Sequence, residues 1–226
     1  MRRTRKAGFT FVGIIAVGVV MVASASAAVP EFEQTATFTS VGTEAVLLEG
    51  KGGGTITCQE SEGEKGLFMA GTKEATKIIL RLKGCATGAE ECQNAGAGSK
   101  EIKTEPLKGT VGYLETESVA GAPNVAFALV TELNNRIALF KCGAKNLEIN
   151  GCVAGTLAEA NKPPANKFTL RFKQAGGMQE IVSYEPEKGK PEACKGVTVD
   201  DEGEVERAGL KTAAKIITCP NMKIKD

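Results

Sequence analysis

Cysteine is the residue of this sequence whose type and spacing could do chemistry. The chain has seven cysteines and no histidine, so it lacks the side chain on which most acid–base sites and many metal sites depend. Cysteines can form disulfides, bind metals or act as nucleophiles. Zinc sites usually draw ligands from closely spaced Cys-x-x-Cys pairs, and the sequence contains no such pair. We therefore expect disulfides and predict neither a metal nor a cofactor.

Cys142 and Cys152 lie close together in sequence, but they are not expected to pair. If a hairpin turns across residues 143–146, Leu147 lies opposite Cys142. Cys152 then lies about 16 Å farther along, at roughly 3.3 Å per strand residue. A disulfide requires Cα atoms within about 7 Å, so Cys142 needs a partner from a distant part of the chain.

Two or three disulfides are predicted, and one cysteine is left over from the three candidate pairs. The expected pairs are Cys85–Cys92, Cys58–Cys142 and Cys194–Cys219. The first closes a short loop, and the last would link the C-terminal segment to itself. Cys152 is then a free thiol. It is either buried as a small hydrophobic residue or available as a reactive thiol or an intermolecular bridge.

Familiar catalytic and binding motifs are absent or incomplete. Without histidine no Ser-His-Asp or Cys-His arrangement can form, and the spacing Gly-x-Ser-x-Gly does not occur. The segment Gly66–Lys73 resembles a phosphate-binding loop, but it ends Gly-Thr-Lys where the motif requires Gly-Lys-Thr. The acidic run Asp200–Glu204 does not follow the ligand spacing of a calcium loop. Its Asp and Gly residues are typical of a solvated hairpin turn.

Paired carboxylates stay open as catalytic groups, because their partners meet only in three dimensions. Glycoside hydrolysis needs two of them about 5 Å or about 6.5–9.5 Å apart in one cleft. Sugar sites usually also carry stacking aromatic residues. The chain has no Trp and only two Tyr, Tyr113 and Tyr184, which lowers the expectation of a glycosidase or a lectin.

The elements that would position these residues are strands. In the segment 168–173, Phe168, Leu170 and Phe172 share one face and polar residues share the other, as in an antiparallel strand with one buried face. Similar patterns predict strands at 35–39, 45–49, 55–58, 78–82, 110–115, 125–130, 137–142, 147–158, 168–173, 181–184, 197–199 and 216–219. Turns rich in Gly and Pro separate them, which favours an all-β antiparallel sandwich or barrel held by disulfides. Residues 202–214 could form one or two helical turns, weakened by two glycines.

The N-terminus predicts export. Residues 1–28 combine a basic start, a short apolar run and small residues suited to cleavage after Ala27 or Ala28. The domain is then 29–226, with 186–226 as an alternative small C-terminal extension. The mature chain carries 24 basic and 27 acidic residues, so we expect no nucleic-acid partner. No second apolar stretch is long enough to span a membrane, which predicts a secreted, extracellular or cell-surface location.

An ordered series of short segments resembles a known group of proteins. The series is Phe38-Thr-Ser, Glu44-Ala45, Gly53–Cys58, Lys83–Cys85, Cys92, Thr104–Gly109, Gly112-Tyr113, Phe140–Gly143, Asn150–Val153 and Phe172–Gln174. Over roughly 35–215 the chain resembles an uncharacterised family of secreted, cysteine-containing all-β proteins that recurs in many copies in some soil actinobacteria. The resemblance transfers no catalytic residue. It implies that Cys58, Cys85, Cys92 and Cys142 are a shared framework, that Cys152 replaces a usual serine, and that Cys194 and Cys219 are additions.

The expected function is that of an exported, non-catalytic binding or cell-surface structural module. Its partner would be an extracellular or cell-envelope ligand, and the site search finds no assembled catalytic constellation. Two alternatives stay open. One is a secreted, carboxylate-based hydrolase acting on glycan or cell-wall polymer. The other is a secreted inhibitor or effector, which would present the disulfide-braced loop 84–98 as a rigid exposed element.

Overall fold

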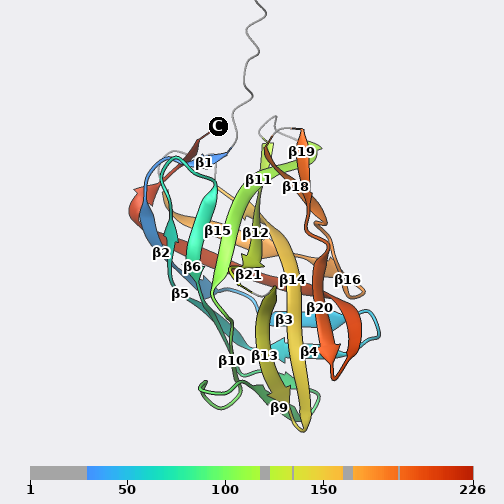
Figure 1. Ribbon diagram of the computed structural model, residues 1–226. Helices are drawn as coiled ribbons and strands as arrows, with labels where there is room; N and C mark the ends of the chain where they lie inside the picture. Colours follow the sequence, from blue (N-terminus) through green and yellow to red (C-terminus); the bar gives the residue numbers. More distant parts are fainter. Residues whose placement is uncertain (1–29, 118–122, 134, 160–164, 188, 226) are drawn as a thin grey trace, which may run out of the picture.

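The computed structural model describes residues 30–117, 123–133, 135–159, 165–187 and 189–225 (Figure 1). The predicted signal peptide, residues 1–28, lies outside the described residues. The described chain forms 22 strands and no helix, and its strand pairings are antiparallel. The predicted all-β antiparallel class is confirmed.

Eight strands pair around a closed circuit, which we call the upper ring. In order around it they are β2 (Ala36–Gly42), β5 (Glu60–Phe68), β6 (Glu74–Ile78), β11 (Leu107–Glu117), β12 (Pro123–Thr131), β14 (Lys145–Ala158), β15 (Ala165–Phe172) and β21 (Glu204–Met222). The circuit closes where β21 pairs with β2. β7 (Leu80–Lys83) and β10 (Glu101–Lys103) extend the wall downward beside β5.

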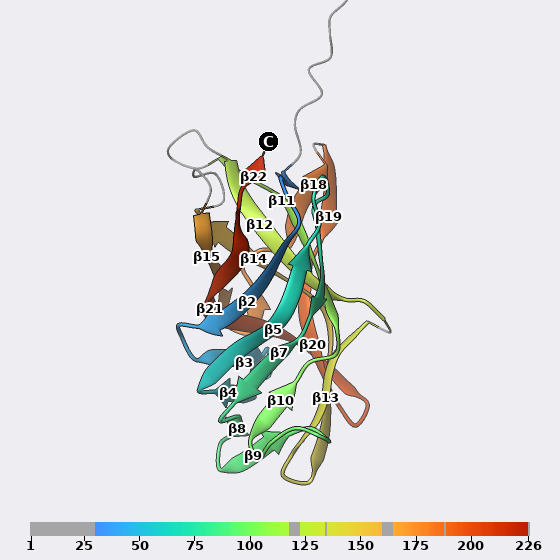
Figure 2. The ribbon, with the colours of Figure 1, turned by 90° about the vertical axis from the view of Figure 1, so that its left-hand side faces the viewer.

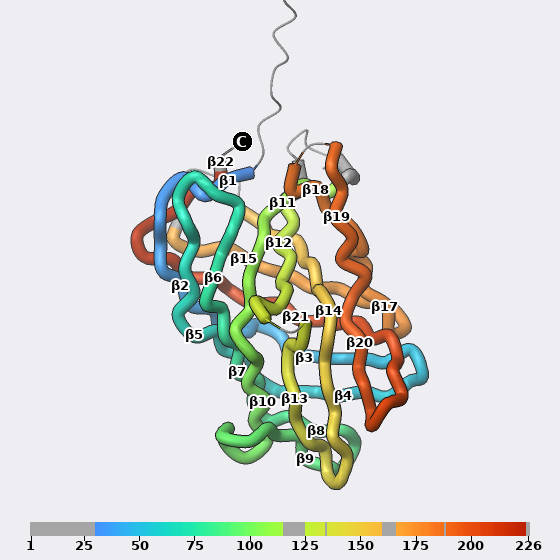
Figure 3. The backbone as a smooth tube through the Cα atoms, viewed as in Figure 1, coloured from blue at the N-terminus to red at the C-terminus, as the bar shows by residue number. Residues whose placement is uncertain are grey.

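A second closed circuit, the lower ring, consists of four hairpins. They are β3 (Val46–Gly50) with β4 (Thr55–Cys58), β8 (Ala86–Thr87) with β9 (Glu90–Gln93), β13 (Arg136–Cys142) with the first half of β14, and β20 (Gly196–Asp201) with the first half of β21. Each hairpin pairs with the next through β4–β8, β9–β13, β14–β20 and β21–β3. The long strands β14 and β21 therefore belong to both rings, which are stacked end to end (Figure 3).

Phenylalanines fill the upper ring. Phe68 is 1% exposed, and its ring centroid lies 4.2 Å from that of Phe38, 4.4 Å from that of Phe32 and 6.3 Å from that of Phe127. Glycine makes room for these rings on the facing strands, because a Cβ at Gly66 would lie 2.2 Å from Phe38 Cζ. The alternating apolar positions predicted from the sequence thus form one continuous core.

The two chain ends close the top of the upper ring. β1 (Glu31–Phe32) pairs with β22 (Ile224–Lys225), and both labels lie at the same end of the molecule in Figure 3. Figure 2 shows β22 at that end beside the C-terminus. Phe32 and Met222 are fully buried, and Ile224 is 2% exposed. The interior is therefore plugged at this end by apolar side chains.

A pair of small hairpins covers the outside of the wall. They are β16 (Gln174–Ala175) with β17 (Met178–Gln179), and β18 (Ser183–Glu187) with β19 (Lys190–Ala193). Tyr184 of β18 packs in a small cluster with Ala126, Ala128 and Ala154, whose side chains are on the outer face of the ring. Residues 186–226 include β20 and β21, which are central strands of the large sheet.

Three features differ from the sequence-based expectation. Residues 202–214, where the sequence allows helical turns, form the turn at 202–203 and the first half of β21. β5 is a strand that the pattern does not reveal, because two of its inward positions are glycines, Gly63 and Gly66, rather than apolar side chains. The segment 84–98 is not a free loop, since it contains the β8–β9 hairpin of the lower ring.

Candidate binding site at the open end of the lower ring

Four cysteines lie in one row across four neighbouring strands of the lower ring. Cys92 of β9 is directly opposite Cys142 of β13, and Cys58 of β4 lies next to Cys85, the residue before β8. The disulfides are Cys58–Cys85 and Cys92–Cys142, with Cα–Cα distances of 3.9 Å and 4.1 Å. The first disulfide joins β4 to the start of the β8–β9 hairpin, where β4 and β8 share only one residue pair. The second joins β9 to β13, which share two.

The predicted pairs Cys85–Cys92 and Cys58–Cys142 are therefore wrong. Cys85 and Cys92 do face each other, but the Cys92 N–H donates to the Cys85 carbonyl at 2.9 Å, and hydrogen-bonded pairs hold their Cα atoms farther apart than non-hydrogen-bonded pairs. Cys58 and Cys142 stand at opposite ends of the row, three strand spacings or about 14 Å apart. Each end cysteine can reach only its immediate neighbour.

The third disulfide is Cys152–Cys194, so the predicted Cys194–Cys219 pair and the predicted free thiol of Cys152 are also wrong. Cys194 follows β19, which folds back over the wall where Cys152 lies. The free cysteine is Cys219, which is exposed on β21 opposite Thr37. The prediction that Cys142 and Cys152 do not pair is confirmed, although Lys145 rather than Leu147 lies opposite Cys142 because the turn has two residues.

The end of the lower ring away from the β1–β22 plug is hollow. Residues from all four hairpin turns line a volume of about 530 Å³ there. Its lining residues are Leu48, Gly50, Gly54, Thr55, Ile56, Thr87, Glu90, Cys142, Lys145, Leu147, Val199, Asp201, Glu204, Val205 and Glu206. This size falls within the range of about 300–1,000 Å³ that is typical of small-molecule sites.

Strand alternation explains why this hollow is apolar inside and charged at its rim. On β20, Val197 and Val199 point inward and are buried, and the next inward residue is Asp201 at the strand end. On β14, Leu147 is followed toward the turn by Lys145. On β14 and β20 the inward-facing row therefore changes from apolar to charged at its last position.

The rim carries four carboxylates and one amine. Lys145 Nζ lies 2.5 Å from Asp201 Oδ2. The hydrogen bond to Asp201 raises the pKa of Lys145 above its usual value of 10.5, and the charges of Asp201, Glu90 and Glu202 act in the same direction. Within the described chain Glu90 and Glu204 form no ion pair. The rim thus has a net charge of three negative units.

A glycine-rich turn fixes the carboxylate of Glu206. The Gly52 N–H donates to Glu206 Oε2 at 3.0 Å, and a Cβ at Gly50 would lie 2.0 Å from Glu206 Oε1. A side chain at residue 50 would displace the carboxylate from this position. The turn at residues 50–54 therefore holds one negative charge of the rim in place.

A second volume lies deeper in the molecule. It measures about 120 Å³ and is lined mainly by apolar side chains from both rings, among them Phe127, Phe140 and Ile149. Leu48 and Ile56 line both this cavity and the rim hollow. The two side chains therefore separate the charged mouth from the apolar interior.

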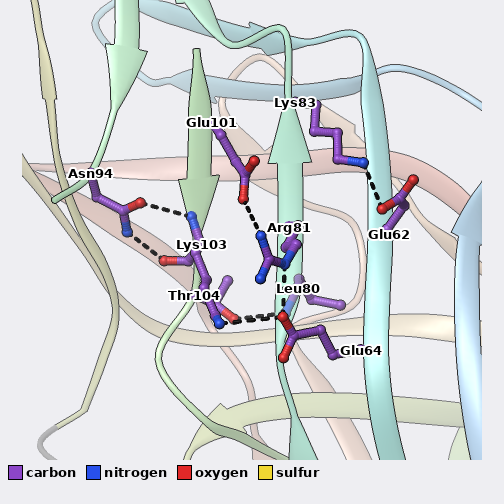
Figure 4. A network of polar contacts seen from close by, with 9 residues as sticks. All are labelled: Glu62, Glu64, Leu80, Arg81, Lys83, Asn94, Glu101, Lys103 and Thr104. Atoms are coloured by element: carbon purple, nitrogen blue, oxygen red, sulfur yellow. Dashed lines mark hydrogen bonds and ion pairs between the residues drawn. The ribbon is translucent and has the colours of Figure 1, made fainter. Parts of the chain in front are cut away.

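Charged residues on the outer wall are paired with one another (Figure 4). Arg81 Nε lies 2.7 Å from Glu64 Oε1, and Arg81 Nη1 lies 2.8 Å from Glu101 Oε1. Lys83 Nζ lies 2.7 Å from Glu62 Oε2. The hydrogen bond from Arg81 and a further one from Lys103 lower the pKa of Glu64. These carboxylates are engaged by cations on β7 and β10 and are poor candidates for a catalytic pair.

The other predicted segments fall into structural roles. Residues 200–204 form the β20–β21 turn, as expected, and the Gly203 N–H donates to Asp200 Oδ1 at 2.7 Å. Gly66–Lys73 runs from β5 through a turn to β6. Burial raises the pKa of Tyr184, whose hydroxyl donates to Glu192 under the outer hairpins. In the sequence, the rim could have been recognised only as charged residues at inward-facing positions near the ends of strands. To use that signal, one must already know which strands belong to the same ring.

Comparison of the chain with family models, with curated proteins and with solved structures finds no match. Among the described residues, no cluster of three or more Cys, Asp or Glu has a geometry that would hold a metal ion. The described part of the chain also contains no helix of the length and hydropathy needed to cross a membrane.

Proposed function

We propose that this protein is an exported, non-catalytic binding module that holds a small ligand in the hollow end of its lower ring. The observation that carries the proposal is the hollow of about 530 Å³, in which four hairpin turns surround an apolar floor and a charged rim. Ligand sites of this kind combine an apolar surface with a few polar groups that orient the ligand. Loops on a rigid scaffold are the usual place for such sites.

Nuclear magnetic resonance of the oxidised protein tests the site. Three probes with the same chain and different heads, hexylammonium, hexanoate and hexanol, are titrated separately. We expect saturable shifts confined to amides of the four turns, including Gly52, Gly143 and Gly203. Shifts spread evenly over the surface, or none with any probe, would reject the site.

A blocking variant makes the test specific. Gly54 lines the hollow, and a Cβ there meets nothing closer than 3.6 Å, so Gly54→Leu fills the hollow without a clash at Cβ. We expect this variant to lose the shifts. The matched control, Thr39→Leu, adds the same side chain on the exposed outer face of β2 and should bind as the parent does.

Export is supported by the predicted signal peptide, by the resemblance to secreted proteins and by three disulfides, which persist in oxidising compartments. Mass spectrometry of protein from the culture medium should find a mature N-terminus at residue 28 or 29. Saturable co-sedimentation with cell-envelope material, by the oxidised but not the reduced form, would favour retention at the cell surface. Retention of residues 1–28 in the isolated protein would contradict cleavage.

A carboxylate-based hydrolase is the second candidate, because the same rim gathers Glu90, Asp201, Glu204 and Glu206. Two observations favour binding instead. Asp201 is paired with Lys145, and none of the residues lining the hollow is aromatic. Release of reducing sugar ends from cell-wall polymer, lost in Glu204→Gln and Glu206→Gln, would establish the hydrolase.

An inhibitor or effector acting through residues 84–98 has less support. Cys85 and Cys92 are fully buried, and the β8–β9 hairpin is part of the ring wall. The segment is therefore not a separate exposed loop.

A further inference from the structure

We infer that the hollow selects an organic cation with a short apolar chain, such as a primary alkylammonium. This inference rests on the proposed function, because it names the ligand class of the same site. It combines the charge of the rim, the chemistry of the floor and the apolar cavity beyond the floor.

The rim contains a repulsive contact that a cation would relieve. Asp201 and Glu204 are direct partners across the β20–β21 turn, and both line the hollow. Like charges directly opposite each other destabilise a strand pair. Lys145 neutralises Asp201, but Glu204 has no ion-pair partner in the described chain. An ammonium group between Glu204, Glu206 and Glu90 would complete the charge balance.

The floor of the hollow suits a hydrocarbon chain. Leu48, Ile56, Leu147 and Val199 lie below the charged residues. At the rim itself, Val205 is 62% exposed, which leaves an apolar side chain beside the acidic groups. A bound alkyl chain would cover this surface and remove it from water.

Leu48 and Ile56 line both the hollow and the interior cavity, so a ligand chain that displaced these two side chains would enter the cavity. That cavity, at about 120 Å³, is mainly apolar, and apolar cavities of about 150 Å³ in other proteins hold a benzene molecule. At this smaller volume a short alkyl chain fits, whereas a long lipid chain does not.

Two other cationic partners fit less well. A metal ion needs a cluster of ligands, and the described residues contain none with that arrangement. A basic peptide would place its charges on the rim, but it would leave the apolar floor uncovered. The combination of acidic rim and apolar floor favours one small amphipathic cation.

The three hexyl probes distinguish the inference from the function on which it rests. We expect hexylammonium to bind at least about ten-fold more tightly than hexanoate, and its affinity to fall as salt is raised because rim charges are screened. Equal binding of all three, or preference for hexanoate or hexanol, would overturn the inference while leaving a binding module. Failure of every probe to shift the turn amides would overturn both.

Replacing the rim carboxylates by neutral amides tests whether they cause the preference for hexylammonium. Glu204→Gln and Glu206→Gln should each weaken hexylammonium binding by up to about five-fold, the range of a solvent-exposed ion pair. Both should leave hexanol binding unchanged. The control, Glu33→Gln, removes an exposed carboxylate near the plugged end and should change neither. An unchanged hexylammonium affinity in the double variant would refute the role of the rim.

Discussion

The upper and lower rings share β14 and β21, yet they are stabilised differently. The upper ring is filled by phenylalanine rings and closed at its end by β1 and β22. The lower ring is held on one side by the disulfides Cys58–Cys85 and Cys92–Cys142 and ends in a hollow. Packing stabilises the first, while covalent links allow the second to keep an unfilled interior near its turns.

The position of the disulfides shows where the ladder alone is weakest. β14 pairs with β20 over six residue pairs and β21 pairs with β3 over four, without a disulfide. β4 and β8 share only one residue pair, and β9 and β13 share two. Each of these two weak pairings carries a disulfide. The disulfides therefore complete the closure of the ring, and a closed ring is what keeps the hollow in shape.

The largest expected loss of stability comes from a substitution in the core of the upper ring. Phe68→Ala removes the ring that contacts Phe32, Phe38 and Phe127, and we expect a loss of about 3–5 kcal/mol of unfolding free energy. Urea unfolding measures it. Phe68→Leu should lose less, and a loss below about 1 kcal/mol in the Ala variant would contradict the assignment of stability to this cluster.

The next largest loss of stability is expected when a disulfide of the lower ring is removed. The double substitution Cys92→Ala and Cys142→Ala removes one disulfide without leaving a thiol, and it should lower the unfolding free energy by about 2–5 kcal/mol. Shifts of the turn amides should accompany the loss. Cys219→Ser is the control, because Cys219 is exposed and unpaired, and its effect should stay within about 0.5 kcal/mol.

A pair of glycine substitutions compares the two interiors directly. Gly66→Ala places a Cβ 2.2 Å from Phe38 Cζ in the filled ring, and overpacking of this kind costs about 1–3 kcal/mol. Gly54→Ala places its Cβ 3.6 Å from the nearest atom in the hollow, so thermal unfolding should change little. Equal effects at both positions would contradict the contrast between the rings.

The smallest expected effect comes from pH. The folded pKa of Glu64 lies below its ordinary 4.5, through its hydrogen bond from Arg81, and that of Lys145 lies above its ordinary 10.5, through its hydrogen bond to Asp201. The Glu64 contribution to stability is therefore present above pH 4.5 and lost as pH falls below it. The Lys145 contribution is present below pH 10.5 and lost as pH rises above it. Both groups are exposed, so both effects are small.

Thermal unfolding from pH 3 to 11 checks this. Glu64→Gln should lose a small contribution at neutral pH and show a shallower fall of stability in acid, and Lys145→Gln should show a shallower fall in alkali. A fall as steep in the variant as in the parent protein would contradict the assignment of that limb.

The sequence by itself determined the strands. Period-two alternation marks most of the longer strands locally, because a buried face requires it whatever the neighbouring strands are, whereas short strands such as β9 and β10 give no such signal. Thus 168–173 and 125–130 match β15 and β12 closely, and the turn at 200–203 follows from its Asp and Gly residues. β5 was missed because the residues that fill the space at its inward glycines, Ser40 at Gly63 and Phe38 at Gly66, belong to β2.

Tertiary structure alone decided which strands are neighbours, and with them the disulfides and the hollow. Cys85 could pair with Cys58 or Cys92, and the choice depends on the β4–β8 register, to which residues far apart in sequence contribute. Glu90, Lys145, Asp201, Glu204 and Glu206 are scattered among three hairpins, and they meet only because the circuit closes. Alternation is a property of one strand, whereas ring closure is a property of all of them together, and no local pattern in the chain encodes it.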